Sequence, residues 1–418
     1  MKRLLFSVLL TLSFSVRAAD EDPVKTAARA SLERIQALRK ERPGDGLLVY
    51  YEALTRIAVG ERDSAFDLLR SLTGRKLGLI PAHGAGFDAV WNDPGFEKIR
   101  KELEAAEPRT KNAPVAFRLS DPTLIPEGIA YDAAGQRFFV GSVAKRKIIV
   151  TDTKGVARDF SSPADKLDCV LGLTIDAARG HLYAVSTNGF MDEAKKERRN
   201  AVLRYDLKTG LATASPSKGE IAASKPVRVV APEAMQLNDL AIASDGTLYV
   251  TDSEAGTLYR KKPDESALTR FGENGALRGA NGIAIAGDGA IYVTLSTGIA
   301  RVDTATGAPV RLPQPDTMVT GGCDGLYWHN GDLIGVQNGP NPGRIIRIGL
   351  ADRGQRIASL AVLQSHHHPE FDEPTTGAIA NGTLNVIGNS YVGHHLPDGS
   401  ITGTNELKGT AIVAVPLK

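Results

Sequence analysis

Residues 236–260, QLNDLAIASDGTLYVTDSEAGTLYR, contain the pattern that decides the predicted fold. Asn238 opens a short apolar run, Asp245 and Gly246 supply a hairpin turn, and LYVTD alternates apolar and polar residues. TLYR then begins a further strand. The stretch therefore predicts consecutive antiparallel strands joined by tight turns.

The same pattern recurs along the chain after about residue 112, and each inner segment is followed by a turn glycine. The inner segments start about 43 to 67 residues apart, a period typical of one four-stranded blade per unit. The sequence therefore predicts a mainly β fold, a six-bladed β-propeller. The inner segments are EGIAYD from Glu127, LGLTID from Leu171, NDLAIA from Asn238, NGIAIA from Asn281, DGLYWH from Asp324 and TGAIAN from Thr376.

Two segments at the ends of this repeat region have strand character but no place in the sequential blades. VAFRLS, residues 115–120, precedes the first inner segment, and GTAIVAVPL, residues 409–417, ends the chain. In a closed propeller such segments pair within the last blade, which removes the free sheet edges. We expect this pairing to close the ring.

The first residues predict a signal peptide over residues 1–19. Lys2 and Arg3 precede an apolar run from Leu4 to Val16, and Ala18 and Ala19 offer a cleavage site. The apolar run is too short to span a bilayer. We therefore expect a periplasmic or secreted protein with no membrane span.

Residues 20–110 predict a small α-helical N-terminal region, and residues 111–418 the propeller. GLLVYYEALTRIAVGERDSAFDLLRSLTG indicates two helices joined at Gly60, with Asp63 and Ser64 available to cap the second. A further helix is expected to begin at Asp93 and Pro94. The first two resemble one tetratricopeptide-type pair, which cannot bury a solenoid core alone. These helices either pack on the propeller or offer a docking site for a protein partner.

Composition and charge narrow the functional classes. The chain is 42% hydrophobic and 23% charged, as expected for a globular protein, and loss of the leader takes the formal charge from +2 to about −1. No basic field remains that would indicate nucleic acid binding. The basic run at residues 195–199 is predicted to be a solvated loop. Cys169 and Cys323 precede inner segments of opposite blades, so we expect two free, buried thiols.

The first position of each inner segment indicates a metal site. Equivalent positions of radially arranged blades lie at one height around the axis, so their side chains converge on one end of the central channel. Two carboxylates and two amides are hard oxygen ligands, suited to Ca²⁺ or another divalent cation. Each pair such as Asn-Gly is also an ordinary turn former, but four oxygen donors in one register favour a metal site. The predicted ligands are Glu127, Asn238, Asn281 and Asp324.

PEGIAYD, LNDLAIASDGTLYVTDS, ANGIAIAGDG and CDGLYW resemble the metal-bearing blades of the regucalcin and gluconolactonase (senescence marker protein) family, in particular a poorly characterised bacterial branch. The resemblance covers residues 115–418. It implies that the four predicted ligands hold a divalent ion, usually calcium, and that Asp324 also acts in proton transfer. It further implies hydrolysis of lactones.

Two further residues are candidates for binding a small-molecule substrate at the channel mouth. Gln236 stands where sugar-lactone members of the family commonly carry an arginine, which puts sugar lactones in doubt because a charged fork is lost. Asn389 is a candidate to line the pocket from the last blade. The run His366 to His368 and the pair His394-His395 lie in loops that could supply a base or a secondary metal site, or could be plain polar surface.

Two functional classes remain open. The first is an exported, calcium-dependent hydrolase of lactone or ester bonds, and the second is a non-catalytic propeller that binds a ligand or a protein around a structural calcium ion. The enzyme needs coordination positions that face solvent, whereas a structural ion is covered by protein.

Overall fold

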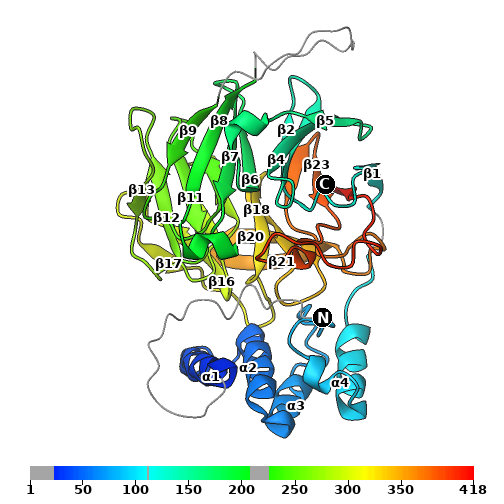
Figure 1. The fold of residues 1–418 in the computed structure, drawn as a ribbon. Helices are drawn as coiled ribbons and strands as arrows, with labels where there is room; N and C mark the ends of the chain where they lie inside the picture. The colour runs from blue at the N-terminus through cyan, green and yellow to red at the C-terminus, as the bar shows by residue number, and fades with distance from the viewer. Residues whose placement is uncertain (1–22, 111–112, 208–225) are drawn as a thin grey trace.

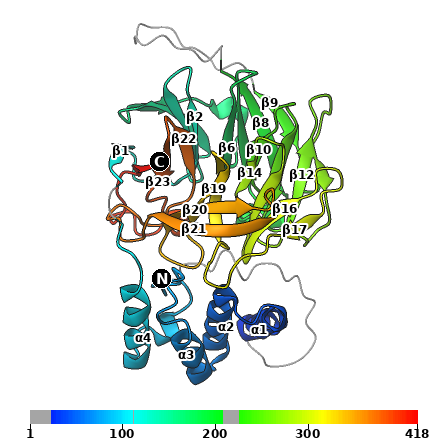
Figure 2. The same cartoon turned by 180° about the vertical axis from the view of Figure 1, so that it is seen from behind.

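The computed structural model describes residues 23–110, 113–207 and 226–418, so the predicted signal peptide lies outside the described residues. Within these ranges, six four-stranded sheets surround a central axis, and four α-helices precede them in the chain (Figures 1 and 2). The predicted fold class, a six-bladed β-propeller after a helical region, is confirmed.

Each blade is an antiparallel meander, and the strands of the first five blades follow one another in sequence from the axis outward. The first blade comprises β2 (Pro126–Asp132), β3 (Arg137–Ser142), β4 (Lys147–Asp152) and β5 (Ala157–Asp159). The second comprises β6 (Cys169–Asp176), β7 (His181–Thr187), β8 (Asn200–Asp206) and β9 (Val227–Val230). The third comprises β10 (Leu237–Ile242), β11 (Leu248–Asp252), β12 (Thr257–Lys261) and β13 (Thr269–Phe271). The fourth comprises β14 (Ile283–Ile285), β15 (Ile291–Leu295), β16 (Gly298–Val302) and β17 (Pro309–Arg311). The fifth comprises β18 (Cys323–His329), β19 (Asp332–Gln337), β20 (Arg344–Ala351) and β21 (Arg356–Gln364).

The sixth blade joins the two ends of the propeller. It comprises β22 (Gly377–Ala380), β23 (Thr383–Ile387), β24 (Ala411–Pro416) and, outermost, β1 (Val115–Arg118). Val115 pairs with Val413 and Arg118 with Ala411 in antiparallel register. The predicted closure by the first and last strands is therefore confirmed, and it leaves the ring without an open seam.

The core consists of apolar layers between neighbouring blades. Phe139 and Leu182 belong to the layer between the first two blades, and Val336 and Val413 to the layer between the last two. A separate cluster fills the helical region and includes Val319 of the propeller. Cys169 and Cys323 are buried free thiols, as predicted. The propeller is thus held together by contacts between blades rather than by one central core.

The helical region contains four α-helices in the described residues, with ends that the sequence largely explains. Asp45 caps α2 and Asp93 caps α4 through side-chain oxygens, and Gly60 ends α2 with a φ of 90°, which glycine adopts without strain. The expected cap at Asp63 and Ser64 was wrong, because the helix that follows Gly60 is α3 (Arg62–Arg70). It begins at Arg62, so Asp63 lies in its first turn. None of the described helices is long and apolar enough to cross a membrane. The helices are α1 (Pro23–Glu41), α2 (Gly46–Val59), α3 (Arg62–Arg70) and α4 (Pro94–Ala105).

These helices pack on one face of the propeller, beside β16, β17, β20 and β21 (Figures 1 and 2). The Tyr51 hydroxyl donates to the carbonyl of Ser296, 3.2 Å away, in the loop that follows β15. Arg344 at the start of β20 donates to the carbonyl of Leu77 at 3.0 Å. In an antiparallel blade the end of the second strand and the starts of the first and third strands share one face. The helices therefore dock on the face where the inner strands begin.

Candidate metal centre at the mouth of the propeller channel

The predicted ligands lie at the starts of the inner strands, as the repeat register requires. Glu127, Asn238 and Asp324 are each the second residue of their strand, and Asn281 lies two residues before β14. In the first, third and fifth blades a register shift of the first strand pair falls on these residues. Such a bulge leaves one residue outside the regular ladder and re-aims its side chain. The bulges therefore turn these side chains away from the blade.

The backbone before Glu127 is held in an unusual conformation. Ile125 has a φ of 47°, which is unfavourable for a β-branched residue, and its side chain is fully buried. Its carbonyl accepts a hydrogen bond from the Val143 N–H at 3.0 Å. The Glu127 carbonyl in turn accepts from the hydroxyl of Thr376 at 2.5 Å. Contacts within the first blade and from the sixth blade thus fix the segment that presents the Glu127 carboxyl group.

Three of the four predicted ligands each have a buried side-chain oxygen that accepts no hydrogen bond. These atoms are Glu127 Oε2, Asn238 Oδ1 and Asn281 Oδ1. The nitrogen ends of both amides are engaged, since Asn238 donates to Ser253 Oγ at 2.8 Å and Asn281 donates to Asp324 Oδ1 at 2.5 Å. Burying a polar oxygen without a partner costs free energy of about 1–3 kcal/mol. Oxygens of this kind, from three blades, are the ligands that hard divalent cations prefer.

Asp324 is the most restrained of the four predicted ligands. Its Oδ1 accepts from Asn281, and its Oδ2 accepts from Asn338 Nδ2 at 2.8 Å. Asn338 also donates to the carbonyl of Pro374 at 2.8 Å, which links the fifth and sixth blades. Two amide donors therefore fix the plane of this carboxyl group while leaving it partly accessible.

A third carboxyl group, that of Asp239, belongs to the same site and was not predicted. The residue after the ring position is glycine in the other five blades, at 128, 172, 282, 325 and 377, and only the third blade carries a side chain there. The Asp239 carboxylate accepts from the Leu240 N–H at 2.8 Å and from the Ile283 N–H at 3.4 Å. A side chain on Gly172 would clash with it at 2.6 Å. The exception in an otherwise glycine column was the signal available in the sequence.

Tyr327 also reaches this site. Its hydroxyl oxygen accepts from the Gly377 N–H at 2.6 Å, so the side chain crosses from the fifth blade to the sixth. Burial raises the pKa of Tyr327, and the charges of Asp239, Asp324 and Glu127 raise it further. Tyr327 therefore lies among the three carboxyl groups and contributes a hydroxyl group to the channel.

The electrostatics of the three carboxyl groups are those of acids that share a poorly solvated space. Burial raises the pKa of Glu127 well above its usual range, and the charges of Asp324 and Asp239 raise it further. Burial likewise raises the pKa of Asp239 to about 7 and that of Asp324 to about 6. Like charges at close range oppose ionisation, and a cation between them would reverse that preference. The arrangement suits either bound protons or a divalent ion.

The remaining positions of the register have structural roles. Leu171 in the second blade is buried in an apolar layer, and Thr376 in the sixth supports the Glu127 backbone. Asn389 accepts from the Ala411 N–H at 2.7 Å and donates to the carbonyl of Gly409 at 3.5 Å, so its amide holds the start of β24. Gln236 lies just before β10, where its backbone N–H donates to Asp252 at 3.1 Å and its side chain is partly exposed.

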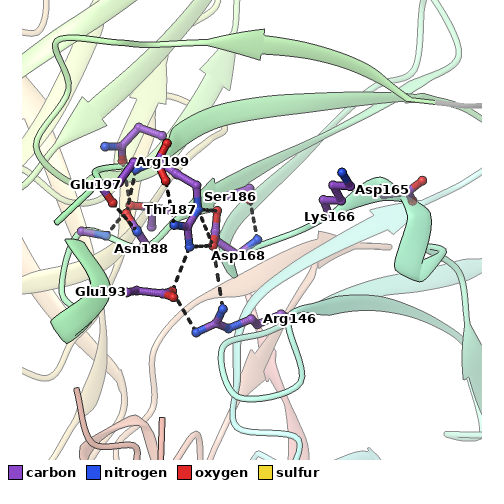
Figure 3. A network of polar contacts seen from close by, with 12 residues as sticks. Arg146, Asp165, Lys166, Asp168, Ser186, Thr187, Asn188, Glu193, Glu197 and Arg199 are labelled. Atoms are coloured by element: carbon purple, nitrogen blue, oxygen red, sulfur yellow. Dashed lines mark hydrogen bonds and ion pairs between the residues drawn. The ribbon is translucent and has the colours of Figure 1, made fainter. Parts of the chain in front are cut away.

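A network of charged residues joins loops of the first and second blades (Figure 3). Arg199 contacts Asp168 at 2.7 Å and Glu193 at 3.0 Å, and Arg146 contacts Glu193 at 3.0 Å. The expectation of a solvated basic loop at residues 195–199 was therefore wrong for Arg199, because the buried Asp168 recruits it. Lys195 remains exposed. These pairs tie the loops of the first and second blades together beside the channel.

Comparison with known proteins does not identify a family for this chain. No protein-family model matches this sequence, and no curated protein is significantly similar to it. Among solved structures, a PQQ-bound aldose sugar dehydrogenase from Streptomyces coelicolor is 15% identical, with coverage of 74% of this chain and 99% of that chain and a TM-score of 0.48. A gluconolactonase from Xanthomonas campestris is 18% identical, with coverage of 72% and 89% and a TM-score of 0.44. A virginiamycin B lyase from Staphylococcus aureus is 14% identical, with coverage of 71% and 97% and a TM-score of 0.44. These neighbours bear the names of different enzymes, so the likeness does not indicate which reaction this chain performs.

Proposed function

We propose that this protein is an exported, calcium-dependent hydrolase of lactone or ester bonds. The observation that supports it best is the set of three buried oxygens without donors, on Glu127, Asn238 and Asn281, next to the restrained carboxyl group of Asp324. This set offers hard ligands to a divalent cation and one carboxylate in reach of a substrate. The resemblance of the four ligand segments to the regucalcin and gluconolactonase family supports the reaction class.

The proposed mechanism gives separate roles to Glu127, Asn238, Asn281 and Asp324, which together are called the channel ring. When bound, calcium supplies Lewis-acid polarisation of a carbonyl group. Glu127, Asn238, Asn281 and Asp324 would hold the ion through their oxygens. Asp324 takes a proton from the attacking water and returns it to the alkoxide oxygen that leaves when the carbonyl carbon–oxygen bond breaks.

The substrate side of the site favours uncharged lactones or esters. Gln236 provides an amide where a charged fork would grip an anionic or strongly polar group. The carboxyl groups of Asp239 and Asp324 add negative charge at the channel, which further disfavours an anionic substrate. Asn389 is engaged by backbone groups, so we assign it no substrate contact.

A non-catalytic role is the second candidate, and the burial of two of the four predicted ligands favours it. Glu127 and Asn238 are only 6% and 8% exposed, which suits a structural calcium ion covered by protein. In that case the propeller would bind a ligand or a protein without turnover. The partly accessible Asn281 and Asp324 favour the enzyme.

Export and a protein partner are separate proposals. The predicted leader at residues 1–19 supports periplasmic or secreted localisation, which N-terminal sequencing of the mature protein would check. We propose that a protein partner binds the helical region on the side that does not face the propeller. The helices already bury one side against the fourth and fifth blades, through Tyr51 and Leu77.

Hydrolysis by the chelated mature protein tests the proposal. We expect a panel of uncharged lactones and esters to be cleaved only after calcium is added back. Asp324→Asn is expected to keep the fold and lower the rate by at least about a hundredfold, because the proton carrier is lost. Asp332→Asn, a carboxylate in the same blade away from the channel, is the matched control. Calcium binding without turnover of any panel member would support the structural-ion alternative instead.

A further inference from the structure

A second cluster of metal-ligating groups lies where the helical region meets the propeller. It consists of Glu104 near the end of α4 and of His366 and His367 in the loop after β21. One ligand atom from each residue lies within 4.8 Å of those of the other two. Among the described residues this is the group of three histidine, cysteine or carboxylate side chains with such spacing. It does not overlap the channel site.

The two imidazole rings are held by their surroundings. Their centroids are 3.8 Å apart with an angle of 37° between the planes. The Nδ1 of His367 lies 3.2 Å from Ser365 Oγ, and that hydroxyl donates to the carbonyl of Thr110 at 2.9 Å. A hydrogen bond of this kind to one ring nitrogen orients the other for ligation. Ser365 and Thr110 thus supply the supporting contacts that metal-binding histidines require.

His366 contributes a buried nitrogen that lacks a hydrogen-bond partner. This atom is Nε2, and its burial without a partner is unfavourable unless something else binds it. A neutral imidazole nitrogen of this kind is a common metal ligand. The neighbouring His368 is excluded as a ligand because its Nε2 lies 2.8 Å from the carbonyl of Ala113.

The local charges leave room for a cation. Glu104 supplies the negative charge, and its contact with Arg100 is long, at 3.5 Å. The charge of the buried Arg344 is opposed by Glu107 at 3.9 Å. A bound metal would displace Arg100 toward solvent, because that side chain is partly exposed on the surface of α4. Binding of a metal by Glu104 would therefore replace one weak ion pair.

We propose that Glu104, His366 and His367 bind a transition-metal ion of the zinc class and thereby clamp α4 to the propeller. Two imidazoles and one carboxylate are ligands that Zn²⁺ accepts in tetrahedral sites, with water in the fourth position. The same set discriminates against Ca²⁺, which prefers oxygen ligands. The clamp joins the last helix to the loop between the fifth and sixth blades. It is independent of the proposed hydrolase activity.

Zinc titration of the chelated, tag-free mature protein by calorimetry tests this site. We expect one zinc ion per chain with micromolar or tighter affinity, and a rise in the thermal unfolding midpoint. Glu104→Gln is expected to weaken zinc binding at least about tenfold, and the double variant His366→Ala with His367→Ala to abolish it. Glu102→Gln, which removes the same charge from an exposed position of the same helix, is expected to bind zinc as the unsubstituted chain does.

Two results would overturn the proposal. One is the absence of zinc binding to the unsubstituted chain at a zinc concentration about 100-fold above a micromolar dissociation constant. The other is equal zinc affinity in the Glu104→Gln chain and its Glu102→Gln control, because binding would then lie elsewhere. Glu104 is partly exposed, so its substitution should not prevent folding. Cobalt substitution gives a second readout, since its visible absorption is expected to change in Glu104→Gln and to stay unchanged in Glu102→Gln.

Discussion

This protein has two candidate metal sites, and they differ in both ligands and origin. They are the channel ring and the junction cluster of Glu104, His366 and His367, where the helices meet the propeller. The ring, made of Glu127, Asn238, Asn281 and Asp324, uses oxygen ligands from equivalent positions of four blades. The junction cluster uses two neighbouring histidines of one loop and a glutamate of a distant helix. A repeated register brings residues together wherever the fold repeats, whereas the junction depends on how two unlike regions dock. The first kind of site is therefore readable from sequence and the second is not.

The largest expected effect is that of Glu127→Gln, which should weaken the channel site and leave the junction cluster unchanged. Glu127→Gln removes one charged ligand of the ring, so we expect calcium affinity to fall by about a hundredfold or more, while zinc affinity at the junction stays unchanged. The buried charge is also removed, so the chelated variant should unfold at a higher temperature than the chelated unsubstituted chain. Calorimetric titrations with each ion check both points. Equal loss of both ions would mean that the sites are not separate.

Leu171 sharpens the same comparison because it occupies the ring register without being a ligand. It is 4% exposed and packs in the layer between the second and third blades. Leu171→Ala is expected to lower the free energy of unfolding by about 2–5 kcal/mol through the cavity it leaves. Calcium and zinc affinities of the folded variant should not change. Denaturant unfolding measures the first effect, and a weakened calcium site in the folded variant would contradict the assignment of roles within the register.

The smallest expected effect is the pH dependence of the chelated protein. Folding raises the pKa of Asp324 to about 6 and that of Asp239 to about 7, from 3.8. Their stabilising contribution is therefore complete below about pH 4 and is lost as the pH rises through 6 and 7. We expect the unfolding midpoint of the chelated chain to fall by a few degrees between pH 5 and pH 8. Saturating calcium should remove that fall, and a midpoint that rises with pH in the chelated chain would contradict the sharing of charge in the channel.

The sequence predicted the parts of the structure that follow from repetition. The six blades, the closure by β1 and β24, and the register of the four ligands all follow from one recurring strand pattern. Asp239 and Asn338 were missed for different physical reasons. Asp239 stands in a column where glycine is otherwise required for close packing of inner strands, and Asn338 follows β19, where the repeat carries no shared residue. Tyr327 reaches the site only because a glycine before it leaves space for its hydroxyl.

The junction could not be predicted because no local pattern encodes docking. Tyr51 and Leu77 are apolar or amphipathic residues of ordinary helical and loop segments, and their propeller partners are backbone carbonyls or a buried arginine. The histidine run at residues 366–368 was visible as a candidate, but its third ligand comes from α4. Only the packing of the helices against the fifth blade brings Glu104 to it.

Diffraction from crystals of the chelated protein soaked in calcium tests the central claim most directly. We expect one ion at the channel mouth, about 2.3–2.6 Å from oxygens of Glu127, Asn238, Asn281 and Asp324. Crystals of Asp324→Asn treated in the same way should show that position empty or weakly occupied. A channel without an ion at millimolar calcium, or calcium bound only elsewhere, would contradict the account.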